Sequence, residues 1–149
     1  MKVSDNFTFL EYFYPTAIEY DIPEALIKGV QYFRDFFGYP MRITSSYRPN
    51  DIFGQHRFGK AVDLVPVNPA NFKTFFDTWE KECVNYKDSG LIQGMRSRGV
   101  NGFGVENNNC VHVDVRDDDK CTLTDKYGKF CIFRWIATPP PYGTSTLIT

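Results

Sequence analysis

The stretch that decides the fold is a short segment in which apolar and polar side chains alternate strictly, Val111-His112-Val113-Asp114-Val115-Arg116. A period of two is typical of a β-strand, because successive side chains point to opposite faces of the sheet. The valines are therefore expected in the core. The opposite face of this strand then carries an imidazole, a carboxylate and a guanidinium group in a row.

The segment before this strand is expected to pair with it as a hairpin. Gly102–Glu106 leads into three asparagines at 107–109, and asparagine favours turns. With that loop, Glu106 lies opposite Cys110, and directly opposed residues share a face of the sheet. Glu106 is therefore predicted on the polar face of the 111–116 strand.

The remaining elements follow from apolar spacing and from capping residues. In chain order they are a short helix capped by Thr8 and Glu11, a helix from Pro23 to Gly38, strands at 41–45 and 60–65, a helix from Asn68 to about Cys83, and a hairpin at about 121–135 with its turn at 125–128. This order predicts an α+β domain with a central antiparallel sheet and helices packed on one side. Residues 1–137 are expected to form this single domain, and 138–149 a tail rich in Pro, Ser and Thr, because prolines cannot continue a sheet.

Composition and charge exclude several classes of protein. The chain has 149 residues, enough for one domain, and its 17% of aromatic residues favours a small, dense core. The net charge is −1, so we expect no basic surface for nucleic acid. No apolar segment reaches the roughly 18 residues of a membrane span, and no signal-peptide-like run follows Met1. We therefore expect a soluble monomer in the cytoplasm of the producing or host cell, or in a virion, that reaches an outside target only after release.

The four cysteines lack a CxxC pair, which argues against a thiolate zinc site. Cys121 and Cys131 flank the predicted turn of the last hairpin, and a disulfide bond between them is one option. Free thiols are the default expectation for a cytosolic protein.

The two histidines of the chain are the candidates for metal binding. His56 precedes Asp63 by seven positions, and Gly59 between them lets the chain turn, so both side chains can face one pocket. His112 adds a third donor from the polar face of its strand. Three nitrogen or oxygen ligands with an open fourth position are what a catalytic zinc site requires. Spacing alone leaves the alternative of two solvated surface histidines.

Four segments of the chain together resemble the motifs of a zinc peptidase family. They are Ser45-Ser46-Tyr47-Arg48, Gln55–Asp63, Val111–Arg116 and Arg134-Trp135. In this order they are similar to the motifs of the zinc D-Ala-D-Ala carboxypeptidase and L-alanyl-D-glutamate endopeptidase family. Asn6–Phe13 also resembles the short leading helix of the small phage-type members, so the resemblance covers the chain from about residue 5 to 136.

The resemblance implies one zinc ion held by His56, Asp63 and His112, in a fold shared with the signalling domain of hedgehog proteins. It further implies a hydrolase whose substrate is a peptidoglycan stem peptide. The bond cut would be an amide, as in a D,D-carboxypeptidase or an endolysin-type endopeptidase. The open fourth position of the zinc ion would hold the water that the metal acidifies.

The same resemblance suggests residues for substrate binding. Arg48 matches the family's arginine, which holds the substrate carboxylate or stabilises the oxyanion; a planar, permanently charged fork suits both tasks. Its neighbours Ser46 and Tyr47 are assigned to substrate binding with it. Alternatively, the ring of Tyr47 packs in the hydrophobic core.

The general base departs from the family pattern. Many members place an Asp or Glu three residues before the last histidine, where this chain has Asn109, which cannot accept a proton as a carboxylate does. Glu106 is the first candidate for the base, because the hairpin register puts it on the face of the site. Asp114 is the second candidate, and it is equally suited to orient His112 as a partner of a metal ligand.

Two other functions fit the same sequence. A non-catalytic recognition domain that keeps its metal is favoured by the missing carboxylate at position 109. A structural phage protein is favoured only by the unexplained last hairpin and the proline-rich tail.

Overall fold

The computed structural model describes residues 1–51, 54–106, 110–136 and 144–147. Its α-helices are α1 (Phe9–Tyr12), α2 (Glu24–Phe37), α3 (Phe72–Val84) and α4 (Gly90–Ser97). Its strands are β1 (Lys2–Ser4), β2 (Phe7–Thr8), β3 (Met41–Ser45), β4 (Ala61–Pro66), β5 (Gly102–Glu106), β6 (Val111–Asp114), β7 (Leu123–Asp125), β8 (Gly128–Ile136) and β9 (Thr144–Leu147). Among the described helices, none combines the length and the apolar composition of a membrane span.

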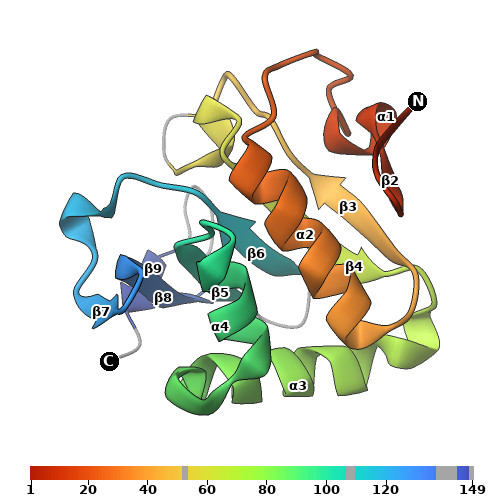
Figure 1. The fold of residues 1–149 in the computed structure, drawn as a ribbon. Helices are drawn as coiled ribbons and strands as arrows, with labels where there is room; N and C mark the ends of the chain where they lie inside the picture. The colour runs from red at the N-terminus through yellow and green to blue at the C-terminus, as the bar shows by residue number, and fades with distance from the viewer. Residues whose placement is uncertain (52–53, 107–109, 137–143, 148–149) are drawn as a thin grey trace.

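One mixed sheet forms the centre of the molecule, with its strands in the order β3–β4–β6–β5–β8–β7 and with β9 also paired to β8. The predicted α+β class is confirmed. The expectation of an antiparallel sheet is wrong at one pairing, because β5 and β8 run parallel, from Gly102 opposite Cys131 to Glu106 opposite Trp135. The chain leaves β6, passes through the β7–β8 hairpin and returns along the other edge of β5, so β8 takes the direction of β5 (Figure 1).

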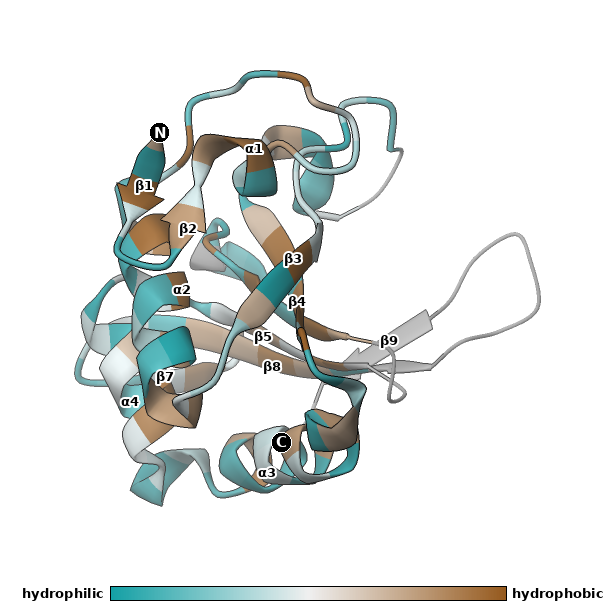
Figure 2. Cartoon of the chain, turned by 90° about the vertical axis from the view of Figure 1, so that its right-hand side faces the viewer, coloured by the Kyte–Doolittle hydropathy of each residue, from teal (hydrophilic) through white to brown (hydrophobic). Residues whose placement is uncertain are grey.

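Helices α2, α3 and α4 pack on one face of this sheet, with α2 and α4 in front of the strands in Figure 1. The helices are amphipathic, and both hydrophobic and hydrophilic colours follow their surfaces in Figure 2. Their apolar sides join the sheet in a single core cluster. The strand residues of this cluster include Val62, Leu64, Phe103, Val111 and Val113. Alternation along β4 and β6 therefore leaves the opposite face of the sheet to other side chains.

Three of the helix boundaries follow the predicted capping signals. Thr8 and Glu11 form a capping box at the start of α1. Gly38 ends α2 in a left-handed conformation, with φ at 77°. The side chain of Asn68 accepts a hydrogen bond from the backbone N–H of Ala70 and begins the 3₁₀ turn that precedes α3.

The sequence interpretation did not include α4. Its signals are present in the chain, because the Ser89 hydroxyl accepts a hydrogen bond from the backbone N–H of Ile92 at 2.9 Å and caps the helix. Leu91, Ile92 and Met95 then form its buried side. The helix has only eight residues, so its apolar stripe is too short to stand out from the sequence.

The last hairpin is cross-linked by a disulfide bond between Cys121 and Cys131. Its predicted turn is confirmed, since Asp125 pairs with Gly128 across the turn. The default expectation of free thiols is wrong for this pair, because the hairpin brings the two cysteines onto facing segments with 5.0 Å between their Cα atoms. Cys83 and Cys110 carry free thiols, and Cys83 is buried in the core.

Part of the expected C-terminal tail belongs to the sheet. Strand β9 pairs antiparallel with β8, from Phe133 opposite Leu147 to Ile136 opposite Thr144. Residues 144–147 therefore extend the domain beyond the predicted boundary at 137. The proline-containing part of that segment, 137–143, lies outside the described residues.

A buried ion pair fastens the β7–β8 hairpin to α4. The guanidinium group of Arg96 donates two hydrogen bonds of 3.0 Å to the Asp125 carboxylate and others to the carbonyl groups of Val100 and Gly128. Burial raises the pKa of Asp125, but the hydrogen bonds from Arg96 outweigh it and hold the pKa below its usual range.

Substituting Asp125→Asn is predicted to lower the free energy of unfolding by about 2 kcal/mol at pH 7, because it leaves the buried Arg96 charge unpaired. A carboxyl group with a lowered pKa stabilises the fold above its unfolded pKa of about 3.9. This contribution disappears as the pH falls through the folded pKa. Urea unfolding should therefore show a difference between the two proteins that narrows below about pH 4.

The matched control is Asp77→Asn, which removes an exposed partner of Lys73. An exposed pair contributes little, so this change should cost less than about 0.5 kcal/mol. A difference between wild type and Asp125→Asn that does not narrow in acid would contradict the role given to the ion pair.

Candidate metal centre

A tight turn between β3 and β4 carries the first candidate ligand. This turn, η1 (His56–Phe58), ends at Gly59, whose left-handed conformation with φ at 69° confirms the predicted change of direction. A Cβ atom on Gly59 would lie 2.7 Å from the ring of Tyr20, so a larger residue would not fit there. The backbone N–H of Arg48 donates to the carbonyl oxygen of His56 at 2.9 Å and ties the turn to the loop after β3.

The other two candidate ligands lie opposite each other on neighbouring strands. Asp63 on β4 pairs with His112 on β6, and both lie on the face of the sheet away from the three helices. On β5, Gly104 occupies the position opposite His112. A Cβ atom on Gly104 would lie 2.9 Å from the Cβ atom of His112, so the glycine leaves room for the histidine.

The three side chains meet at one carboxylate oxygen. Nε2 of His56 and Nδ1 of His112 each lie 3.1 Å from Oδ1 of Asp63. The possible ligand atoms of the three residues all lie within 4.8 Å of one another. His56, Asp63 and His112 are 4%, 7% and 6% exposed, so the group is almost closed to solvent. The structure therefore brings the predicted triad together as a buried group that can hold a metal ion.

The hydrogen bonds of the two remaining ring nitrogens show that this donor set fits a cation. Nδ1 of His56 lies 2.8 Å from the carbonyl oxygen of Ser46, which can only accept, so Nδ1 carries a proton. Nε2 of His112 donates to Oδ2 of Asp114 at 2.7 Å. In neutral imidazoles the other two nitrogens then present lone pairs, and both face the Asp63 carboxylate. Three electron-rich atoms this close need a positive charge between them, as a metal ion or as a proton.

The charges in the metal-free state follow from the same contacts. Burial raises the pKa of Asp63, but the two imidazoles outweigh it and hold the pKa well below its usual range. Burial lowers the pKa of His112, yet the hydrogen bonds to Asp114 and Asp63 raise it to about 10. Without a metal ion, a second proton on His112 therefore donates to Asp63, and a metal ion must displace that proton.

Asp114 acts on the ring of His112 and has no exposure to solvent. Nε of Arg116 donates to its Oδ1 at 2.8 Å, and a second guanidinium nitrogen donates to its Oδ2. Burial raises the pKa of Asp114, but the guanidinium and imidazole groups lower it overall. A Cβ atom on Gly102 would lie 1.9 Å from Oδ1, so only glycine fits beside this carboxylate. A buried carboxylate on the far side of a ligating imidazole is typical of metal sites.

Ser46, which the resemblance assigns to substrate binding, contacts the candidate ligand His56. Its side chain is buried, and its hydroxyl group donates to the carbonyl oxygen of Tyr14 at 2.6 Å. Its own carbonyl oxygen accepts the proton of His56 Nδ1. The hydroxyl group and the carbonyl oxygen of Ser46 therefore both have hydrogen-bond partners within the protein.

The other two residues of the substrate-binding assignment lie on the same loop. The ring of Tyr47 packs against that of Tyr20, with 5.1 Å between the ring centroids, and Tyr47 is half-buried. Nε of Arg48 lies 2.8 Å from Oδ2 of Asp51, and the side chain of Arg48 is 39% exposed. Of the three residues, Arg48 is the one that presents a charged group to solvent.

The backbone of Glu106 has the predicted hairpin register. Strands β5 and β6 pair up to Val105 opposite Val111, and Glu106 and Cys110 follow on the two sides of the loop. The described part of Glu106 is its backbone. Residues 107–109, which include Asn109, lie outside the described residues.

Sequence reasoning missed Phe133, an aromatic residue beside the triad. The ring of Phe133 meets the ring of His112 edge-on, with 5.3 Å between their centroids. Phe133 also packs with the disulfide of Cys121 and Cys131. Only the parallel pairing of β5 with β8 brings Phe133 opposite Gly104, and no local pattern in the sequence reveals that pairing.

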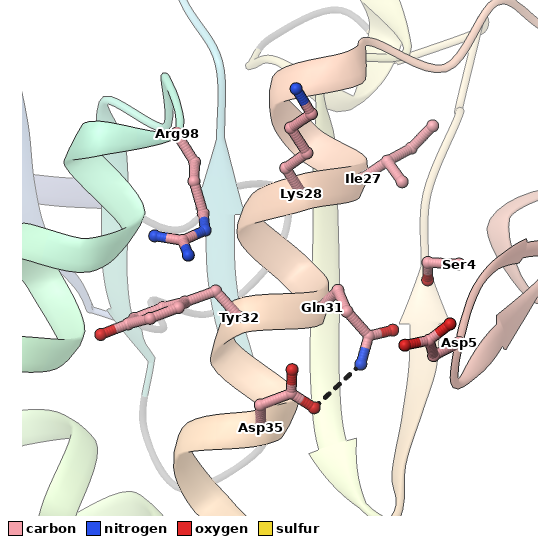
Figure 3. A pocket seen from close by; sticks show the side chains of 8 residues that line it. All are labelled: Ser4, Asp5, Ile27, Lys28, Gln31, Tyr32, Asp35 and Arg98. Carbon is pink, nitrogen blue, oxygen red and sulfur yellow. Dashed lines mark hydrogen bonds between the residues drawn. The ribbon is translucent and has the colours of Figure 1, made fainter.

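A separate hollow of about 320 Å³ lies between the β1–β2 turn, α2 and the end of α4 (Figure 3). Charged and polar side chains line it, among them Asp5, Lys28, Asp35 and Arg98. The guanidinium carbon of Arg98 lies 4.1 Å from the ring centroid of Tyr32, so one face of that ring is covered. None of the predicted site residues lines this hollow.

Neither the models of known protein families, nor the curated proteins, nor the solved structures include a match to this chain. The assignment of a function therefore depends on the chemistry of the site and on the resemblance of its motifs.

Substituting His112→Ala or Asp63→Asn is predicted to abolish stoichiometric metal binding, because each change removes one of three donors. The loss of affinity should exceed the roughly 100-fold that is typical for an outer partner of a ligand. Elemental analysis after incubation with zinc and desalting should find one ion per chain in the wild type and little in either variant.

Asp77→Asn again serves as the matched control, because its carboxylate is exposed and distant in sequence from the triad. This variant should bind one zinc ion per chain. Full zinc content in His112→Ala would refute the assigned ligands.

Proposed function

We propose that the chain is a zinc metallopeptidase that hydrolyses amide bonds in peptidoglycan stem peptides. The observation that carries the proposal is the buried convergence of His56, Asp63 and His112, with both imidazole lone pairs directed at one carboxylate. Two imidazoles and a carboxylate are a donor set of catalytic zinc sites. The substrate class comes from the resemblance of the surrounding motifs.

Bound zinc supplies an acidified water molecule and polarises a carbonyl group, which is the chemistry that amide hydrolysis needs. The residues of the chain then have separate tasks. Ser46 and Asp114 hold the two imidazole rings in the tautomers that face Asp63. The strands β4 and β6 keep Asp63 and His112 at a fixed spacing.

The general base is assigned to Glu106. Both oxygens of Asp114 accept hydrogen bonds from His112 and Arg116, and the residue has no solvent exposure, so it suits orientation of the imidazole. Glu106 continues β5 two positions beyond Gly104, which lies opposite His112. A carboxylate from this position is our candidate for taking a proton from water and delivering it to the leaving amine.

Arg48 is assigned to the substrate carboxylate or to the oxyanion. Its side chain is 39% exposed and its Nε lies 2.8 Å from Oδ2 of Asp51, so binding of a substrate carboxylate would exchange one carboxylate partner for another. The backbone bond from Arg48 to His56 keeps the base of this side chain beside the metal ligand.

A second candidate is a recognition domain that binds cell-wall peptides without cutting them. The asparagine at position 109 favours it, because the family's usual carboxylate is missing there. The two candidates differ in one measurable result, which is the release of soluble products from the wall.

Incubation of the zinc-loaded protein with purified sacculi is predicted to release soluble products, either free D-alanine or fragments of the stem peptides, detected by chromatography and mass spectrometry. Free D-alanine as the product indicates a carboxypeptidase, and peptides released by a cut at an internal bond of the stem indicate an endopeptidase. Glu106→Gln should keep its zinc and lose hydrolysis by about 10²- to 10⁴-fold, the usual contribution of a general base. Asp114→Asn should instead bind zinc more weakly.

The matched control is Glu24→Gln, which changes an exposed glutamate paired with Lys28 and should leave hydrolysis unchanged. If the zinc-loaded wild type sediments with sacculi but releases nothing, the recognition domain replaces the enzyme. If Glu106→Gln stays active and Asp114→Asn keeps its zinc but is inactive, Asp114 is the base.

A further inference from the structure

A guanidinium group lies behind the metal centre and holds the carboxylate that contacts His112. We propose that Arg116 is a positioning residue for this centre: its two-pronged contact fixes Asp114 so that His112 presents Nδ1 to the metal ion. The proposal rests on the metal site proposed above. It gives a function to Arg116, to which the sequence motifs assign none.

The contact between Arg116 and Asp114 occupies both carboxylate oxygens. Nε donates to Oδ1 at 2.8 Å, while a second nitrogen of the guanidinium group donates to Oδ2. Oδ2 also accepts the Nε2 proton of His112 at 2.7 Å. A planar guanidinium group that binds both oxygens fixes the plane of the carboxylate, which a single point charge does not do.

Arg116 is itself held in place on two sides. Its backbone N–H donates to Oδ1 of Asn101 at 2.7 Å, and Nδ2 of Asn101 donates to its carbonyl oxygen at 2.7 Å. Its guanidinium carbon lies 5.0 Å from the ring centroid of Phe133, which in turn packs against His112. The side chain of Arg116 is 21% exposed, so water has limited access to compete for the contact.

These contacts restrict rotation of the His112 ring. Phe133 blocks one side of the ring, and the Asp114 carboxylate fixes the hydrogen bond of Nε2. If the carboxylate lost its fixed plane, the ring would lose the hydrogen bond that keeps Nδ1 directed at Asp63. A role for Arg116 only in fastening β6 to β5 would leave the metal affinity of the folded protein unchanged.

The test is the binding of zinc and of cobalt(II) to the purified full chain, measured by competition with a chromophoric chelator. Arg116→Gln is expected to weaken zinc binding about 10- to 100-fold, the range for outer partners of metal ligands. It should also change the visible absorption bands of bound cobalt(II), which report the geometry of the ligands. Arg116→Lys should lose less affinity, about 3- to 10-fold, because it keeps the charge without the fork.

The matched control is Arg98→Gln, which removes an arginine that contacts Tyr32 between α2 and α4 and should change neither measurement. Wild-type affinity and an unchanged cobalt spectrum in folded Arg116→Gln would overturn the positioning role. If Arg116→Gln does not fold, the zinc affinity and the cobalt(II) spectrum of Arg116→Lys test the positioning role instead. Retention of metal by His112→Ala would instead overturn the metal centre itself, so the two failures are distinguishable.

Discussion

The site depends on one electrostatic constraint: a carboxylate oxygen faces two imidazole nitrogens in a space that water hardly enters. The carbonyl oxygen of Ser46 accepts a hydrogen bond from Nδ1 of His56, and the carboxylate of Asp114 accepts one from Nε2 of His112. The other nitrogen of each neutral ring therefore presents a lone pair to Asp63. These two nitrogens and the carboxylate oxygen of Asp63 repel one another unless a cation lies between them. A proton on His112 serves this purpose in the metal-free protein: burial lowers the pKa of His112, but the hydrogen bonds to Asp114 and Asp63 raise it overall.

The fold meets this constraint by giving the two faces of its sheet different tasks. One face packs against α2, α3 and α4 and forms the core, while the other carries the triad. Space on that face comes from two glycines of β5, since a side chain at Gly102 would collide with Asp114 and one at Gly104 with His112 and Phe133. Beside the triad, Phe133 of the disulfide-linked β7–β8 hairpin covers this face, because its ring packs against His112 and against the two cysteines.

Much of this arrangement could be predicted from local sequence patterns. Alternation in Val111–Arg116 predicted both the core valines and the polar face, and turn residues predicted the β5–β6 hairpin. The two histidines and the turn at Gly59 indicate the candidate triad, and the family resemblance is what assigns it to a zinc ion. Local patterns do not report which strands meet at long range, so they do not predict the parallel pairing of β8 with β5. For the last hairpin they allow both free thiols and the disulfide that the structure shows. The role of Arg116 was missed for the same reason, because it depends on Asn101 and Phe133, which adjacent strands bring together.

The most direct test of the centre is the protonation and ligation state of each imidazole nitrogen, read from long-range ¹H–¹⁵N spectra of the zinc-loaded protein. With only two histidines in the chain, all four ring nitrogens can be assigned. We expect zinc on Nε2 of His56 and on Nδ1 of His112, with protons on Nδ1 of His56 and Nε2 of His112. The account would be contradicted if zinc left the chemical shifts of both rings unchanged, or if zinc were bound by Nδ1 of His56 and Nε2 of His112.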